Sequence, residues 1–124
     1  MEVRDLTIEE IIEIHDRIIA TTGGESGIQS NGNLDFTVEQ VKFAEDFIKK
    51  AAILMRGIIE RHPFIDGNKR TGLRCLETFL RYNYKEVMAE DKDLKEMLLN
   101  IAMGNLTLPE IIRWLNENTK TKND

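Results

Sequence analysis

The sequence is poor in the residues that mark several classes of protein. Its only cysteine is Cys75, so the chain can form no internal disulfide and no four-cysteine zinc site. It has two prolines, no apolar run long enough to span a bilayer, and a start, MEVRDLTIEE, without the apolar core of a signal peptide. A basic excess is also missing, since 22 acidic and 17 basic residues leave a formal net charge of −5. We therefore expect a cytoplasmic protein with no membrane and no direct nucleic-acid partner.

What the sequence does contain is an ordinary globular balance. With 124 residues, 41% hydrophobic and 31% charged, it is expected to form one domain around one core. Apolar spacing predicts helices from Thr7 to the first glycine pair, from about 35 to 62, from about 69 to the YNYKE segment, from about 94 to Gly104, and from Thr107 onward. Capping boxes are expected at Thr7, Thr37 and Thr107. The fold class is all-α, a bundle of about five to six helices with no convincing strand pair.

Three segments depart from this helical pattern. Residues 23–33, GGESGIQSNGN, hold too little apolar matter to pack alone and predict a glycine-rich loop. Gly57 interrupts a strong helix, so we expect another backbone to pack closely there, that of the helix after Lys69. Residues 119–124, TKTKND, have nothing to bury and are expected to be a disordered tail after a domain of residues 1–118.

The run HPFIDGNKR, residues 62–70, joins the end of one predicted helix to the start of the next. It places Lys69 and Arg70 in a first helical turn, where the helix dipole disfavours cations by about 0.3–1 kcal/mol each. Cations are favourable there when an anion sits among them. Free N–H groups at a helix N-terminus, a glycine and two cations together predict a phosphate cradle.

Each part of this run also has a plain structural interpretation. Asp66-Gly67 is an ordinary turn pair, Lys69 and Arg70 can be a solvated surface pair, and His62 can simply end a helix. Their joint occurrence favours a functional site, because a turn needs neither the histidine before it nor the cations after it. Elsewhere, His15 beside Asp16 is interpreted as structural or surface, because adjacent helical residues do not face each other. Cys75 is interpreted as a small buried hydrophobe.

The run resembles the central motif of the Fic/Doc (death-on-curing) superfamily, His-x-Phe-x-Asp/Glu-Gly-Asn-Gly-Arg-x-x-Arg. Six positions match: His62, Phe64, Asp66, Gly67, Asn68 and Arg70. Two depart, since Lys69 replaces a glycine and Leu73 replaces the second arginine. Arg74 comes one residue late, about 100° round the helix, so that role is not transferred to it. Both departures resemble the Doc branch, as do the upstream IIEIHDRII and the GGESGI loop, whose position matches the flap of the superfamily; the alternative for the loop is a mobile connector.

The resemblance implies a role for each matching residue. His62 is the expected general base that takes the proton from a target hydroxyl. Asp66 is the expected ligand of Mg²⁺ bound with the nucleotide, a hard cation that prefers oxygen. Gly67 and Asn68 are expected to supply donors to phosphate oxygens. Lys69 and Arg70 are expected to bind phosphate and to neutralise charge in the transition state.

The leading hypothesis is therefore a Doc-like transferase that moves a phosphoryl group from ATP, or another nucleoside triphosphate, to a Ser/Thr hydroxyl of a target protein. A toxin–antitoxin role follows from the same resemblance. Because the sequence shows no convincing internal inhibitory helix, a separate antitoxin is a plausible partner. Two alternatives stay open: Fic-type adenylylation (AMPylation), which usually accompanies glycine in place of Lys69, and a non-catalytic nucleotide- or phosphate-binding module, which needs no base at His62.

Overall fold

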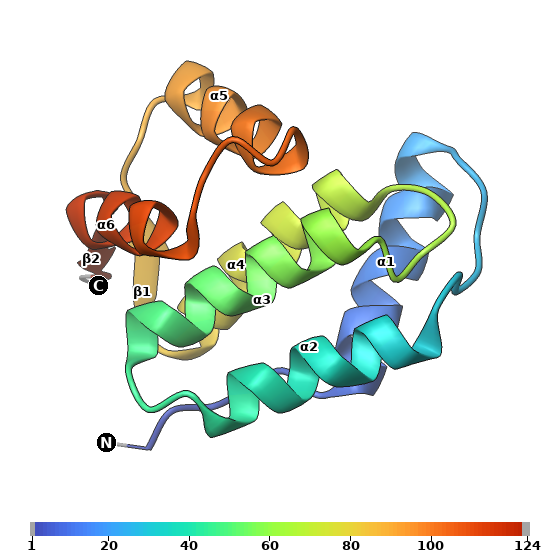
Figure 1. The fold of residues 1–124 in the computed structure, drawn as a ribbon, viewed down its shortest axis with the longest axis horizontal. Helices are drawn as coiled ribbons and strands as arrows, with labels where there is room; N and C mark the ends of the chain where they lie inside the picture. Colours follow the sequence, from blue (N-terminus) through green and yellow to red (C-terminus); the bar gives the residue numbers. More distant parts are fainter. Residues whose placement is uncertain (1, 123–124) are drawn as a thin grey trace.

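The computed structural model describes residues 2–122, which form six helices and one small sheet (Figure 1). The single hydrophobic core and the helical content confirm the predicted all-α class. In chain order the elements are α1 (Ile8–Thr22), α2 (Asn31–Phe43), α3 (Phe47–Arg61), α4 (Asn68–Tyr82), β1 (Lys85–Val87), α5 (Asp91–Ala102), α6 (Leu108–Asn118) and β2 (Thr119–Thr121).

Helix α3 is the centre of the fold. It packs against α2, α4, α5 and α6, and in Figure 1 it lies between α2 on one side and α5 and α6 on the other. Its residues 51–55 are all buried, as the wide apolar pattern of this segment predicts. Helix α4 runs beside it, and α1 packs against α4. The turn between α3 and α4 is therefore fixed at both ends by buried helices.

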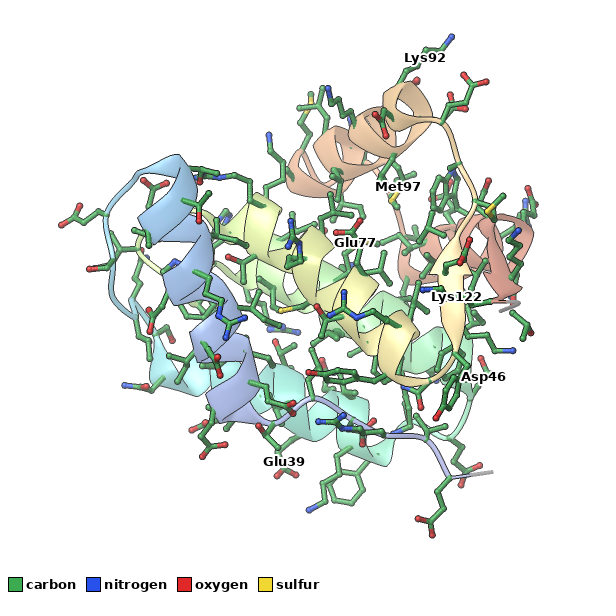
Figure 2. The ribbon with its side chains drawn as sticks, turned by 180° about the vertical axis from the view of Figure 1, so that it is seen from behind. Glu39, Asp46, Glu77, Lys92, Met97 and Lys122 are labelled. Atoms are coloured by element: carbon green, nitrogen blue, oxygen red, sulfur yellow. The ribbon has the colours of Figure 1, made fainter. Side chains whose placement is uncertain are left out.

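The predicted helix over about 35–62 is wrong in one respect, because it is two helices. Ala44 is extended, and the Asp46 side chain accepts the N–H of Lys49 to start α3; Figure 2 labels Asp46. An aspartate at an N-cap satisfies a donor that the helix interior leaves unpaired. The capping box at Thr37 is also wrong, since Ser30 caps α2 and Thr37 is buried within it. The boxes at Thr7 and Thr107 are confirmed.

The close packing expected at Gly57 is present, but its partner is different. A Cβ at Gly57 would lie 2.5 Å from the Cγ2 of Thr37, so the neighbour is α2. Helix α4 meets α3 at Gly72 instead, where a Cβ would lie 2.6 Å from the Cγ1 of Ile59. Two helices thus approach α3 closely, each where one of the facing residues has no side chain.

The expected disorder from residue 119 is contradicted for residues 119–121, which form β2. This strand pairs antiparallel with β1, Glu86 opposite Lys120, so the absence of a strand pair was also a wrong expectation. The N–H of Lys122 donates to the carbonyl of Tyr84 (Figure 2 labels Lys122). Backbone hydrogen bonds hold this segment. The expectation of disorder considered only apolar side chains, which such bonds do not need. Residues 123–124 of the predicted tail lie outside the described residues.

None of the described helices has both the length and the apolar character needed to cross a membrane.

Candidate active site

Residues 62–67 join α3 to α4, and we call them the functional turn. It begins with a change of backbone direction at His62. Helix α3 ends at Arg61, and His62 adopts the left-handed conformation, with φ 48° and ψ 59°. Pro63 disfavours a helical residue before it, which explains why the helix stops there. After this reversal Phe64 is fully buried, while the His62 side chain stays exposed. The turn therefore anchors itself in the core through Phe64 and presents an imidazole to solvent.

Asn68 fixes the shape of this turn. Its side-chain Oδ1 accepts the N–H of Phe64 at 3.0 Å, and its Nδ2 donates to the Phe64 carbonyl at 2.9 Å. The same Nδ2 lies 3.5 Å from the Nδ1 of His62, at the outer limit of a hydrogen bond. The Asn68 side chain, 8% exposed, is thus engaged within the protein. Because the side-chain amide of Asn68 is occupied in this way, only the backbone N–H of Asn68 is left to bind phosphate.

The first turn of α4 presents free donors beside two cations. Gly67 is the N-cap, in the left-handed conformation with φ 76°, and offers no side chain as a cap. The first intrahelical bond runs from the N–H of Thr71 to the Gly67 carbonyl, so the N–H groups of residues 68–70 precede it. Lys69 and Arg70 are exposed at this end. The structure thus contains the arrangement that the sequence predicted for anion binding.

Asp66 is exposed and accepts two backbone hydrogen bonds. Its Oδ2 accepts the N–H of Glu25 at 3.2 Å, and its Oδ1 accepts the N–H of Gly67 at 2.8 Å. These bonds, with a smaller contribution from the charge of Arg70, hold the pKa of Asp66 below its ordinary value. The carboxylate is therefore ionised at neutral pH.

The donor set around Asp66 suits magnesium only in combination with a nucleotide. Among residues 2–122, no group of three or more His, Cys, Asp or Glu side chains gathers as a metal site. Magnesium is commonly held by one or two carboxylates, with phosphate oxygens and waters completing the shell. Asp66 can supply one such carboxylate beside the first turn of α4. Its chemistry is compatible with the predicted metal role, which stays a prediction.

The glycine-rich loop lies against the motif. Ile28 and Phe64 form an antiparallel bridge, the N–H groups of Gln29 and Ser30 donate to the Pro63 carbonyl, and the N–H of Ile65 donates to the Gly27 carbonyl. We call residues 23–30 the flap. It pairs with the turn through its backbone, which favours the expectation of a flap over that of a mobile connector. The predicted loop ran to residue 33, whereas α2 already begins at Asn31.

With this geometry in place, the comparison with known proteins decides the family. The chain matches the Fic/DOC family over residues 5–80, a stretch that includes the flap and the whole HPFIDGNKR segment. The chain belongs to the Fic/DOC family.

Relatives of this Fic/DOC chain include two Doc proteins, in agreement with the predicted branch. The protein kinase doc of Escherichia phage P1 is 27% identical over 115 residues, which cover 88% of this chain and 90% of the phage protein. The toxin Doc of Mycolicibacterium smegmatis (strain ATCC 700084 / mc(2)155) is 35% identical over 86 residues, covering 63% of this chain and 66% of that protein. The resemblance to the Doc branch is confirmed.

Sequence reasoning missed what α1 contributes to this Fic/DOC site. His15, Ile19 and Thr22 lie on one face of α1, at spacings of four and three residues. The Nε2 of His15 is 2.7 Å from the Asp66 carbonyl, and the hydroxyl of Thr22 accepts a hydrogen bond from Arg70. Of the two interpretations of His15, structural or surface, the surface one is wrong, since its side chain is buried. The i, i+4, i+7 spacing was the available signal, but it did not show which segment this face contacts.

Arg74, the arginine displaced from the family position, lies one turn after Arg70 in α4. It is exposed and pairs with Glu77 one turn along α4, with 3.4 Å between Nε and Oε1. It also lines a groove of about 330 Å³ between α1 and α4. Thr22, which accepts the hydrogen bond from Arg70, lines the same groove.

Proposed function

We propose that this protein is a Doc-type protein kinase, which transfers the γ-phosphoryl group of ATP to a serine or threonine hydroxyl of a target protein. The observation that carries the proposal is the first turn of α4, which follows the ionised Asp66 and combines free backbone N–H groups with the cations Lys69 and Arg70. A relative that covers most of this chain is named a protein kinase. The coarser part of the proposal, a transferase of the Fic/DOC kind, draws on family membership as well.

His62 is proposed as the general base. Its imidazole is exposed in the functional turn, and histidine is the side chain whose ordinary pKa lies closest to neutral. In the proposed step, His62 takes the proton from the target hydroxyl while that oxygen forms a bond to the γ-phosphorus. The bond between the γ-phosphorus and the bridging oxygen breaks, and ADP leaves with that oxygen. Such general-base assistance contributes about 10²–10⁴-fold to a rate.

The anion-binding groups are proposed to position the nucleotide. The backbone N–H groups of residues 68–70 point out of the helix end, and Lys69 and Arg70 supply positive charge. Phosphoryl transfer depends on positioning and charge neutralisation, so these groups are the parts it requires. Asp66 would hold Mg²⁺, which neutralises phosphate charge when bound. Gly67 permits close approach of the phosphates because it has no side chain.

Lys69 is the reason to favour phosphoryl over nucleotidyl transfer. In the resemblance to Fic proteins, glycine at this position accompanies adenylylation, whereas lysine accompanies the Doc branch. A long cationic side chain at the helix end occupies space that glycine leaves open. It would thereby favour a nucleotide orientation that brings the γ-phosphorus to the attacking hydroxyl.

A toxin role belongs to the same proposal. The mycobacterial relative is named a toxin, and this name supports a toxin–antitoxin function for the present chain. The expected partners are a cytoplasmic target protein with a Ser/Thr hydroxyl and a separate antitoxin.

Labelled ATP tests the reaction directly. The purified protein is incubated with cell extract and with ATP labelled in either the γ- or the α-phosphate. Label from the γ-phosphate on a protein band supports the proposal. Label from the α-phosphate replaces it with adenylylation, and label from neither, together with ATP binding, replaces it with a binding module. His62→Ala in parallel shows whether the labelling belongs to this site.

Magnesium dependence is tested separately by calorimetry with ATP. For the wild-type protein we expect ATP to bind more tightly with Mg²⁺ than without it, and for Asp66→Ala we expect this enhancement to disappear. Asp93→Ala is the matched control, because Asp93 is an exposed carboxylate in the first turn of a different helix, α5. Equal enhancement in the Asp66 variant and the control would remove Asp66 as the ligand.

A further inference from the structure

The contact between α1 and the functional turn has a consequence for the site. We propose that His15 is a positioning residue, which holds the Asp66–Gly67 peptide in the orientation that the metal and phosphate groups require. This inference rests on the proposed function, because it concerns the same site. His15 does not face solvent, with 1% of its surface exposed, so it acts through the turn and not on a substrate.

The hydrogen bond places a proton on the Nε2 of His15. A carbonyl oxygen can only accept, so the Nε2 that lies 2.7 Å from the Asp66 carbonyl must carry the proton. The Nδ1 is 3.9 Å from a carboxylate oxygen of Asp16, beyond hydrogen-bond distance. Among the described residues, the strong polar contact of the buried ring is therefore the one with Asp66. A buried polar ring is costly unless it is paired, so a histidine here is explained by that carbonyl.

The bond to this carbonyl also orients the other side of the same peptide. The C=O of Asp66 and the N–H of Gly67 belong to one planar trans unit, so they point in opposite directions. With the C=O held by His15, the N–H is directed to the Oδ1 of Asp66, 2.8 Å away. Rotation of this peptide would remove the donor from Asp66 and change the N-cap of α4 together. His15 thus controls the carboxylate and the helix start through one bond.

Stacking fixes the imidazole itself. The rings of His15 and Phe64 are parallel within 6°, with centroids 3.9 Å apart. Phe64 is fully buried, and its backbone is held on both sides by the amide of Asn68. The ring of His15 therefore rests on the rigid part of the turn while its Nε2 reaches the exposed part. A purely packing role would be served by an apolar ring, without the bond to Asp66.

Two substitutions separate the bond from the packing. His15→Phe keeps a ring for the stack on Phe64 and removes the donor. His15→Gln gives up the ring and keeps an N–H donor at a similar reach. Ile11→Val is the control, because Ile11 is fully buried one turn earlier in α1, and its truncation weakens the core without removing a hydrogen bond. Each variant is measured for thermal stability and for ATP affinity by calorimetry, with and without Mg²⁺.

We expect His15→Phe to lose about 10–100-fold of the Mg²⁺-dependent ATP affinity, the cost typical of removing an outer partner of a metal ligand. His15→Gln should retain most of this affinity, even if it is the less thermally stable of the two. Ile11→Val should lower the melting temperature and leave the Mg²⁺ enhancement unchanged. Rescue by the glutamine, together with loss in the phenylalanine variant, is a pattern that general destabilisation does not produce.

The outcomes distinguish this inference from the proposed function. If the wild-type protein shows no Mg²⁺ enhancement of ATP binding, the proposed function itself fails. If the wild type shows it and His15→Phe keeps it, or if Ile11→Val loses it equally, the positioning role is overturned while the proposed function stands. Should His15→Phe not fold, nitrogen NMR of the wild-type imidazole decides the matter. A proton on Nε2 supports the inference, and an Nε2 without a proton overturns it.

Discussion

The backbone N–H of Glu25 donates to the Oδ2 of Asp66, joining the flap to the functional turn across 41 residues of sequence. A Cβ on the preceding Gly24 would lie 2.7 Å from the same oxygen, so the flap passes too close for a side chain there. The proposed metal ligand thus also accepts one of the hydrogen bonds that join the flap to the turn. A cation bound at Asp66 would share the carboxylate with these two N–H donors, since the other oxygen is bonded to Gly67.

This contact predicts a pH dependence of the flap. Hydrogen bonds from Glu25 and Gly67 lower the pKa of Asp66 from its ordinary 3.8. A group whose pKa is lower in the folded protein stabilises it above the unfolded value, and this contribution is lost as the pH falls through the folded value. The amide NMR signals of Glu25 and Gly67 should therefore shift together, with a common midpoint below 3.8. In Asp66→Asn this shared transition should be absent; its persistence would assign the titration to another group.

Removal of the proposed base should abolish transfer and leave the fold intact. His62 is exposed, so His62→Ala opens no cavity, and we expect a loss of about 10²–10⁴-fold in the rate of target labelling. ATP affinity should change little, since the phosphate donors lie on α4. Arg61→Ala is the control, an exposed neighbour at the end of α3. If His62→Ala labels the target at the wild-type rate, His62 is not the general base.

Lys69→Gly should change which phosphorus reacts. Loss of the side chain opens the helix end, and in-line transfer tolerates little misplacement, about 1 Å costing up to 10²-fold. We expect strongly weakened phosphoryl transfer and detectable adenylyl transfer, with His62 needed for both. Intact-mass spectrometry of the target distinguishes a phosphate from an adenylate. An adenylate added by the wild-type protein would contradict the kinase proposal, whatever the variant does.

Substitution by alanine should change the free energy of unfolding in opposite directions at three helical glycines. At Gly72 and Gly57 a Cβ would lie 2.6 Å and 2.5 Å from buried neighbours, so overpacking should destabilise by about 1–3 kcal/mol, reduced by the helix propensity of alanine. Gly32, in the first turn of α2, has only the Ser30 hydroxyl at 3.9 Å, and alanine there should stabilise by about 0.4–1 kcal/mol. Urea unfolding measures all three. Equal effects at Gly32 and Gly72 would contradict the close approach of α4 to α3.

Much of the fold could be predicted because its causes are local. Apolar spacing over three to four residues predicted α1 and α4, and the capping boxes at Thr7 and Thr107 marked the starts of two helices. The break at Asp46 was a local signal as well, but the apolar residues on both sides of it suggested one continuous helix. The Doc-like motif was also visible, since its residues are close together in the chain.

The sequence by itself determined α1 and α4, the family motif and the cations at the start of α4, because each depends on residues within a few positions of one another. Only the tertiary structure decided how the site is held together. The bond from His15 to the Asp66 carbonyl spans 51 residues, and the pairing of the flap with the turn uses backbone groups that every residue carries. Such bonds leave no periodic pattern in the sequence, because their partners meet only after α1, α3 and α4 pack around one core.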